Sequence, residues 1–105
     1  MGRENEIRVT CRTPTQGRTG TTSIPKWKYD CVRQAIIDTL DASAPTPFPF
    51  KDLANAVKTR LTPEDISEFG SIGWHVTTVK LNMEVKGEIS RIPDASPQML
   101  VRTKL

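Results

Sequence analysis

Cysteine and histidine are scarce in this chain. The two cysteines, Cys11 and Cys31, form no Cys-x-x-Cys pair, so a metal site or a redox couple has little support and free thiols are expected. The single histidine, His75, has no cysteine or carboxylate near it at zinc-ligand spacing, which indicates a structural role. We therefore expect neither a bound metal nor a cofactor.

Catalytic motifs are missing as well. No local motif joins His75 to a nucleophile such as Ser71 or Cys31. Residues 17–20 lack the Gly-Lys-Ser/Thr ending of a phosphate-binding loop. We expect no enzymatic activity and no small-molecule substrate.

Long apolar runs are also absent. No stretch approaches the roughly 18 apolar residues of a membrane span, and the charged side chains of Arg3, Glu4 and Glu6 stand where a signal peptide would be apolar. We expect a cytoplasmic protein with no membrane association. A chain of 105 residues, 36% hydrophobic and 26% charged, has the composition of one globular domain with a modest core.

Positive charge is concentrated near the start of the chain. The formal net charge is +3, and residues 1–33 hold seven basic against three acidic side chains, a local balance of +4. Such an asymmetry is typical of a basic arm that is attracted to phosphate or to another acidic surface. Solvated arginines on a tail would give the same pattern, so both interpretations stay open.

The hydrophobic pattern predicts an initial strand and a long first helix. Residues 7–12 alternate between apolar and polar side chains, as a half-buried strand does, and a turn-rich stretch follows. From Pro25 the pattern becomes helical, with Ser23 as the expected cap. The proline-rich segment 44–49 ends this helix. Its expected inward residues are Tyr29, Val32, Ile36 and Leu40.

Two further helices and a hairpin are expected in the second half. A second helix covers about residues 51–61, and Thr62 and Pro63 begin a short helical turn that ends near Gly70. A long third helix covers residues 71–86 and stops at Gly87. Residues 88–92 and 98–102 then alternate as two strands joined by a turn. The inward stripe of the third helix is Ile72, Val76, Val79 and Met83.

This order of elements, in which the third helix runs into a Lys-Gly-x-Ile-x-Arg step at residues 86–91, resembles the winged helix-turn-helix module. A closer likeness is to a family of small uncharacterised bacterial winged-helix proteins that carry a domain of unknown function. The segments that carry it are Pro-Thr-Gln-Gly-Arg-Thr at 14–19 and Trp-His-Val-Thr-Thr-Val-Lys-Leu at 74–81.

The resemblance implies an α+β fold: three main helices, a C-terminal β-hairpin wing, and an N-terminal strand or extended arm. Residues 1–24 are then a basic arm with a short strand, and residues 25–105 are the winged-helix domain.

The resemblance also implies a nucleic-acid-binding protein, such as a small transcriptional regulator that binds double-stranded DNA. In DNA-binding members of the superfamily the third helix enters the major groove and the hairpin contacts the backbone. The candidate nucleic-acid contacts are Arg12, Arg18, Lys26, Lys28, Thr77, Thr78, Lys80, Asn82, Arg91 and Arg102.

One feature of the third helix departs from this pattern. At 100° per residue, Trp74, Leu81 and Val85 fall on the side opposite the inward stripe, so the face that should contact DNA is apolar. Such a face needs a cover, and the N-terminal strand, a second copy of the chain or another protein partner would each supply one. The alternative function is therefore a non-catalytic protein-interaction or dimerisation module, with these three residues at its interface.

Overall fold

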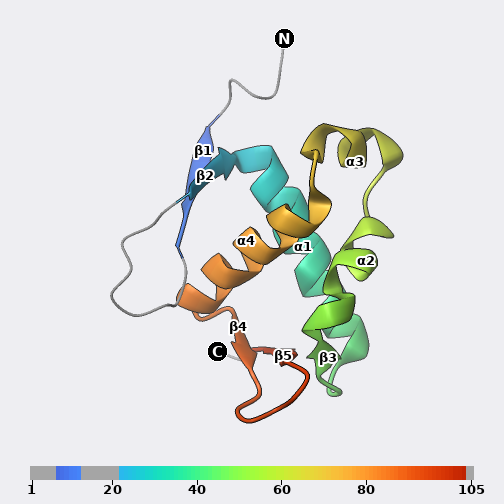
Figure 1. Ribbon diagram of the computed structural model, residues 1–105, viewed down its shortest axis with the longest axis vertical. Helices are drawn as coiled ribbons and strands as arrows, with labels where there is room; N and C mark the ends of the chain where they lie inside the picture. Colours follow the sequence, from blue (N-terminus) through green and yellow to red (C-terminus); the bar gives the residue numbers. More distant parts are fainter. Residues whose placement is uncertain (1–6, 13–21, 104–105) are drawn as a thin grey trace.

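Two helices, α1 (Lys26–Ser43) and α4 (Ile72–Val85), cross at the centre of the molecule and pack against each other. The computed structural model describes residues 7–12 and 22–103 (Figure 1). Three shorter helical segments lie between the two long helices in sequence. These are the 3-10 helix η2 (Phe50–Asp52), α2 (Leu53–Lys58) and α3 (Pro63–Phe69).

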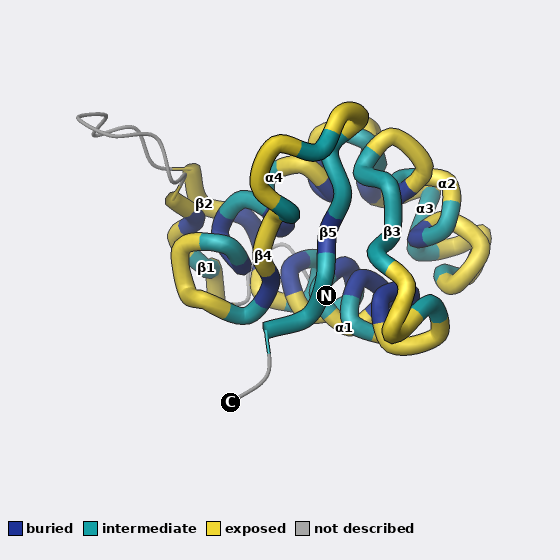
Figure 2. The backbone as a smooth tube through the Cα atoms, turned by 90° about the horizontal axis from the view of Figure 1, so that it is seen from below, coloured by how far each residue is buried: buried dark blue, intermediate teal, exposed yellow. Residues whose placement is uncertain are grey.

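The strands form two small antiparallel sheets at opposite ends of the described structure (Figure 1). At one end, β1 (Arg8–Cys11) pairs with β2 (Thr22–Pro25). At the other end, β5 (Met99–Arg102) lies between β3 (Phe48–Pro49) and β4 (Ile89–Arg91). Figure 2 shows β5 in the middle of this sheet, with α1 beside it.

The helix ends follow the local sequence closely. The Thr62 hydroxyl accepts a hydrogen bond from the Asp65 amide at 3.1 Å, and the Ser71 hydroxyl accepts one from the Trp74 amide at 3.2 Å. Both are N-cap interactions that satisfy a free amide of the first turn. Beyond the end of α4, Gly87 has a φ of +78°, a conformation that glycine adopts without a steric cost.

The core confirms the expected inward stripes of both long helices. Val76, Val79 and Met83 of α4 are at most 1% exposed, while Ile72 is half-buried at the edge. The four expected residues of α1 are also buried. Burial of these aliphatic side chains, each contributing about 1.5–3 kcal/mol when fully buried, is the main stabilising term in this region.

The structure differs from the expected element order in three places. Ser23 lies in β2, where its hydroxyl accepts a hydrogen bond from the Arg8 Nε at 2.9 Å, and it does not cap α1. Phe48–Pro49 forms a strand because the edge of β5 offers a partner there. The helix expected at 51–61 divides into η2 and α2 and ends at Lys58. The described residues thus form a mixed α+β structure with four α-helices and two small antiparallel sheets.

The strand pair at the start of the chain contributes to the same core. Cys11 of β1 and Ile24 of β2 are only 3% and 2% exposed, and both belong to the hydrophobic cluster built by α1 and α4. The strand expected at residues 7–12 is therefore present at 8–11 and packs against the helices.

Val79 provides a direct test of the α4 register. Val79→Asp should lower the free energy of unfolding by about 3 kcal/mol or more, because it places an unpaired charge in the core. Thr77→Asp, two residues away on an exposed position, is the matched control and should change little. Urea unfolding of both variants measures the difference, and equal effects would contradict this register.

Candidate functional site

The outer face of α4 is the candidate site. We use this name for Trp74, Thr77, Thr78, Leu81 and Val85, which share one side of the helix. Trp74 and Val85 are 47% and 44% exposed, Thr77 is exposed, and Thr78 and Leu81 are half-buried. None of the five side chains carries a charge. The helix therefore presents an uncharged, largely apolar surface to solvent.

The N-terminal strand was one of three covers that the sequence left open, and within the described residues it does not cover the outer face. β1 packs beside α4, and the amide of Arg12, next to β1, donates to the Asn82 Oδ1 at 2.9 Å. Asn82 lies on a different side of the helix from the outer face. The strand thus covers the flank of α4 and leaves Trp74 and Val85 exposed.

Lys80, an expected groove contact, is one of the most buried side chains in the described structure, with 2% exposure. Its ammonium group forms an ion pair with Glu84 one turn later and lies 4.6 Å from the centre of the Phe50 ring. Burial lowers the pKa of Lys80, and Glu84 opposes that shift. The expectation of a groove contact is wrong for Lys80, because its charge is used inside the fold.

Asn82 is the second correction among the expected groove contacts. It is 5% exposed, and its Nδ2 donates to the Tyr29 hydroxyl at 2.8 Å while its Oδ1 accepts from the Arg12 amide. A buried amide needs such partners, because leaving it unpaired would cost about 1–3 kcal/mol. Asn82 therefore ties α4 to α1 and to the end of β1, and it is not available at the surface.

The two arginines expected near the wing lie on the C-terminal sheet and are both held by carboxylates. Arg91 Nε donates to the Glu84 Oε1 at 2.8 Å, so Glu84 joins it to the Lys80 ammonium. Arg102 donates from one guanidinium nitrogen to both carboxylate oxygens of Asp41 at 2.9 Å. Their positive charge is thus partly compensated by neighbouring acids.

The basic residues expected on the N-terminal side lie just after β1 and in the first turn of α1. Arg12 is exposed, and Lys26 pairs with Asp30 at 2.6 Å. The Lys28 ammonium lies 5.7 Å from the ring centres of both Trp27 and Phe69. Arg18 lies outside the described residues. Arg12 follows the end of β1 that pairs with Thr22, whereas Lys26 follows Pro25, which pairs with Arg8 at the other end of the two strands. The structure therefore does not bring the expected contacts together on one surface.

His75 packs in an aromatic cluster beside the outer face. Its ring lies 4.9 Å from those of Phe69 and Trp74, and its Nδ1 is 2.8 Å from the Ser71 carbonyl oxygen. Burial lowers the pKa of His75, the hydrogen bond to Ser71 opposes this shift, and the charge of Lys28 adds to it. His75 thus fixes the position of Trp74 at the start of the outer face.

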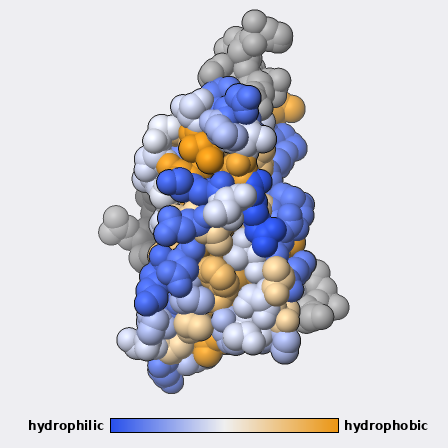
Figure 3. Space-filling model, turned by 90° about the vertical axis from the view of Figure 1, so that its right-hand side faces the viewer, coloured by the Kyte–Doolittle hydropathy of each residue, from blue (hydrophilic) through white to orange (hydrophobic). Residues whose placement is uncertain are grey.

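The face that carries α2 and α3 has a different character. It is mostly hydrophilic, with separate small hydrophobic patches (Figure 3). Within the described ranges, no three or more histidine, cysteine or acidic side chains gather in a way that would hold a metal ion. No helix in those ranges is long and apolar enough to cross a membrane.

The lowered pKa of His75 predicts a loss of stability in mild acid. The unfolded chain takes up a proton near the ordinary value of 6.5, whereas the folded protein does so only at lower pH. The free energy of unfolding should therefore fall as the pH drops below about 6.5 and through the folded pKa. His75→Phe keeps an aromatic ring against Phe69 and removes the titration. Urea unfolding at about pH 7 and about pH 5 should show a smaller loss for this variant, and equal losses would rule out His75 as the cause.

The comparison with protein families covers almost the whole described structure. The model of a family of unknown function, DUF6958, matches residues 8–100, from β1 to the middle of β5. No curated protein and no solved structure matches the chain. Because the family model spans far more than half of the sequence, this chain belongs to the family of unknown function DUF6958.

Proposed function

We propose that the chain is a winged-helix protein that acts as a non-catalytic interaction module and pairs with a second copy of itself. The order of elements supports the scaffold: a first helix, a short strand, further helices, and a C-terminal hairpin that joins that strand in one sheet. In this arrangement α4 takes the place of the third helix and β4–β5 that of the wing. The seven-residue helix α3 between α2 and α4 is an addition to the simple module.

The observation that carries the interaction function is the uncharged outer face of α4. Trp74 and Val85 remain about half exposed on a helix whose other sides are buried. A large aromatic side chain held at the surface is typical of the anchoring residues of protein interfaces. Exposed apolar residues that share one helix face also mark association surfaces more often than isolated ones do.

Two features of the outer face favour a second copy as the partner. First, a two-fold symmetric contact brings the same surface of both copies together, and a face without charges causes no electrostatic repulsion there. Second, Trp74 and Val85 lie at opposite ends of the face, eleven residues or about 16 Å apart along the helix axis. An antiparallel pair of α4 helices would therefore place the large Trp74 of each copy against the smaller Val85 of the other.

The energy available indicates a weak dimer. Burying the remaining exposed half of Trp74 or Val85 gains roughly 1 kcal/mol each, so two copies gain about 4 kcal/mol from these side chains. Association costs about 4 kcal/mol or more in lost translational and rotational freedom. The balance depends on Leu81 and the two threonines of the face, and the dimer should dissociate on dilution.

Val85→Glu tests this contact. The added charge should shift the protein toward monomer, because a carboxylate at the contact would be buried against the apolar Trp74 of the other copy. Ala42→Glu, at an exposed small apolar position on α1, is the matched control and should leave the association unchanged. Sedimentation over a series of protein concentrations measures the monomer fraction of each variant. A wild-type protein that stays monomeric at every concentration would overturn the proposal.

Nucleic-acid binding is the second candidate, and the winged-helix order of elements favours it by analogy of scaffold. The residues that remain available for it are Thr77 and Thr78 on α4 and the basic residues Arg12, Lys26 and Lys28. Thr77 and Arg12 are exposed. Because Lys80 and Asn82 are buried, any such binding would rest on phosphate contacts more than on contacts to bases.

This second candidate predicts binding to duplex DNA that weakens steeply with salt. Arg12→Gln should reduce the slope of log affinity against log salt concentration by about 1, because one phosphate contact is lost. Lys58→Gln, an exposed lysine on α2, serves as the control for a general change in net charge. Fluorescence anisotropy of a labelled duplex measures the slope, and identical slopes for both variants would exclude Arg12 as a contact.

A further inference from the structure

A groove between α1 and β5 contains two adjoining hollows. One has a volume of about 270 Å³ and is lined by residues that include Arg33, Ile37 and Lys86. The other has a volume of about 250 Å³ and is lined by residues that include Leu40 and Ala44. Both are lined by Arg102, so they meet at this side chain. The α1 residues recur at helical spacing along one side, which makes the two hollows parts of one groove.

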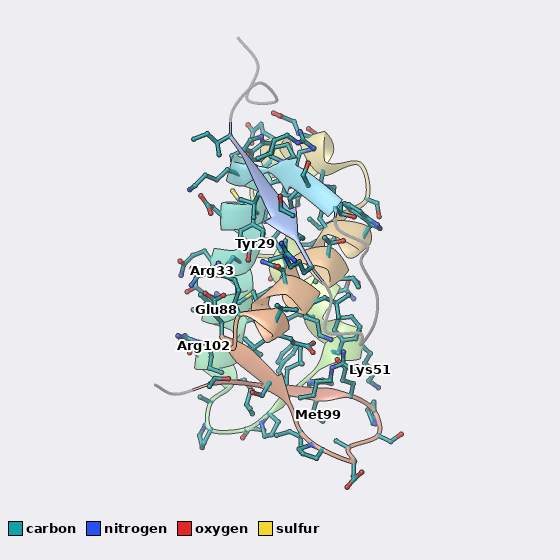
Figure 4. All side chains as sticks on the ribbon, turned by 90° about the vertical axis from the view of Figure 1, so that its left-hand side faces the viewer. Tyr29, Arg33, Lys51, Glu88, Met99 and Arg102 are labelled. Carbon is teal, nitrogen blue, oxygen red and sulfur yellow. The ribbon has the colours of Figure 1, made fainter. Side chains whose placement is uncertain are left out.

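The first hollow is positively charged. Arg33 uses two guanidinium nitrogens to hold the Glu88 carboxylate at 3.0 and 3.1 Å, and Arg102 holds Asp41. Figure 4 shows Arg33, Glu88 and Arg102 close together along this side of the molecule. In each of these pairs the charges balance. The ammonium group of Lys86 lies 5.9 Å from the centre of the Tyr29 ring, and the described part of the chain supplies no carboxylate for it. This end of the groove therefore carries one uncompensated positive charge.

Arg102 also retains hydrogen-bonding capacity. Its Nε is buried and has no hydrogen-bond partner within the described residues. Protein atoms cover this Nε, so it is not the donor that a ligand would reach. One terminal nitrogen, Nη1, holds Asp41, and the other, Nη2, makes no hydrogen bond within the described residues and remains for an acceptor in the hollow. The hydroxyl of Thr103, which also lines this hollow, offers a further polar contact.

The second hollow is mainly apolar. Leu40, Ala44, Pro45, Leu100 and Val101 supply most of its wall, and the charges there, Asp41 and Arg102, are paired with each other. Along α1, the distance from Ile37 to Ala44 corresponds to about 10 Å. The groove thus offers an apolar channel beside a site for a single negative charge.

We propose that the α1–β5 groove binds a small amphiphilic monoanion, a carboxylate whose apolar body lies along the second hollow. The carboxylate lies in the first hollow, where it pairs with Arg102 and is attracted by the charge of Lys86, and the hydrocarbon part contacts Ala44, Pro45 and Val101 along the second hollow. A carboxylate matches the single uncompensated charge, whereas a doubly charged phosphate would exceed it. The two hollows together approach the size of small-molecule sites in other proteins. This site is separate from the outer face of α4 and does not depend on the interaction proposed there.

Octanoate, 4-phenylbutyrate and hexanoate are suitable probes. As controls, 1-octanol has a hydrocarbon chain without a charge, and inorganic phosphate has a negative charge without a hydrocarbon chain. Amide chemical shifts in a titration of the full chain should move at residues of the groove for at least one of the three acids. Neither control should produce the same changes at equal concentration. Absence of binding by all three acids, or equal binding of 1-octanol and octanoate, would overturn the proposal.

Three single variants test which end of the groove binds the carboxylate and which end binds the hydrocarbon part. Lys86→Gln should weaken binding of the acid that binds best by roughly fivefold or more, because it removes the uncompensated charge. Thr46→Glu, at an exposed position on the rim of the apolar hollow, should also weaken it by placing a carboxylate beside the hydrocarbon part. Lys51→Gln, an exposed lysine on the other side of the molecule (Figure 4), is the control for net charge.

These outcomes decide the proposal. Affinity that falls with Lys86→Gln and Thr46→Glu but not with Lys51→Gln supports the site in the orientation described. Unchanged affinity for Lys86→Gln, or an equal loss for Lys51→Gln, overturns it. Unfolding curves of all three variants, measured in parallel, should match the wild type because each substitution is at the surface.

Discussion

The burial of α4 on all but one of its sides is the constraint on which the rest of the structure depends. A helix enclosed by α1, α2, β1 and the C-terminal sheet must satisfy every polar side chain that points inward. Lys80 does so through Glu84 and the Phe50 ring, and Asn82 does so through Tyr29 and the end of β1. Glu84 also holds Arg91 of β4, so both the C-terminal sheet and the N-terminal strand pair are attached to this one helix. Breaking such a buried ion pair by removing one partner costs about 3–5 kcal/mol, more than any exposed pair contributes.

The sequence was sufficient to predict much of the fold. The spacing of Val76, Val79 and Met83 predicted the buried side of α4, Thr62 predicted where α3 begins, and Gly87 predicted where α4 ends. These signals are local: a period of 3.6 residues, a capping hydroxyl and a left-handed glycine each depend on a few neighbouring residues. The strands β2 and β3 depend on partners distant in sequence, and their own residues give no comparable signal.

The same distinction explains the outcome at the candidate site. Helical spacing gives the direction in which Lys80 and Asn82 point from the helix axis. It does not show that the Phe50 ring and β1 pack against the helix in those directions. A lysine at 2% exposure is unusual enough that a surface role was the natural expectation from sequence. A glutamate four residues after a lysine was a visible signal of an i,i+4 pair, and Arg91 near the wing supplied a third charge. Such pairs are common on exposed helix faces, so the triad showed a partner for Lys80 but not its burial.

Two surfaces with different chemistry, the outer face of α4 and the α1–β5 groove, meet at the C-terminal end of α4. Val85 belongs to the uncharged outer face, whereas the next residue, Lys86, lines the charged end of the α1–β5 groove. Successive side chains of a helix point about 100° apart around its axis, so these two neighbouring residues belong to different faces of α4. That end is held by ion pairs to α1 and to β4, through Glu88 and Glu84. A ligand influences a distant contact only when it binds two states of the protein differently. Val85 of the outer face and Lys86 of the groove are neighbours in the chain. A ligand in the groove would therefore influence the contact at the outer face by changing the position of this last turn of α4.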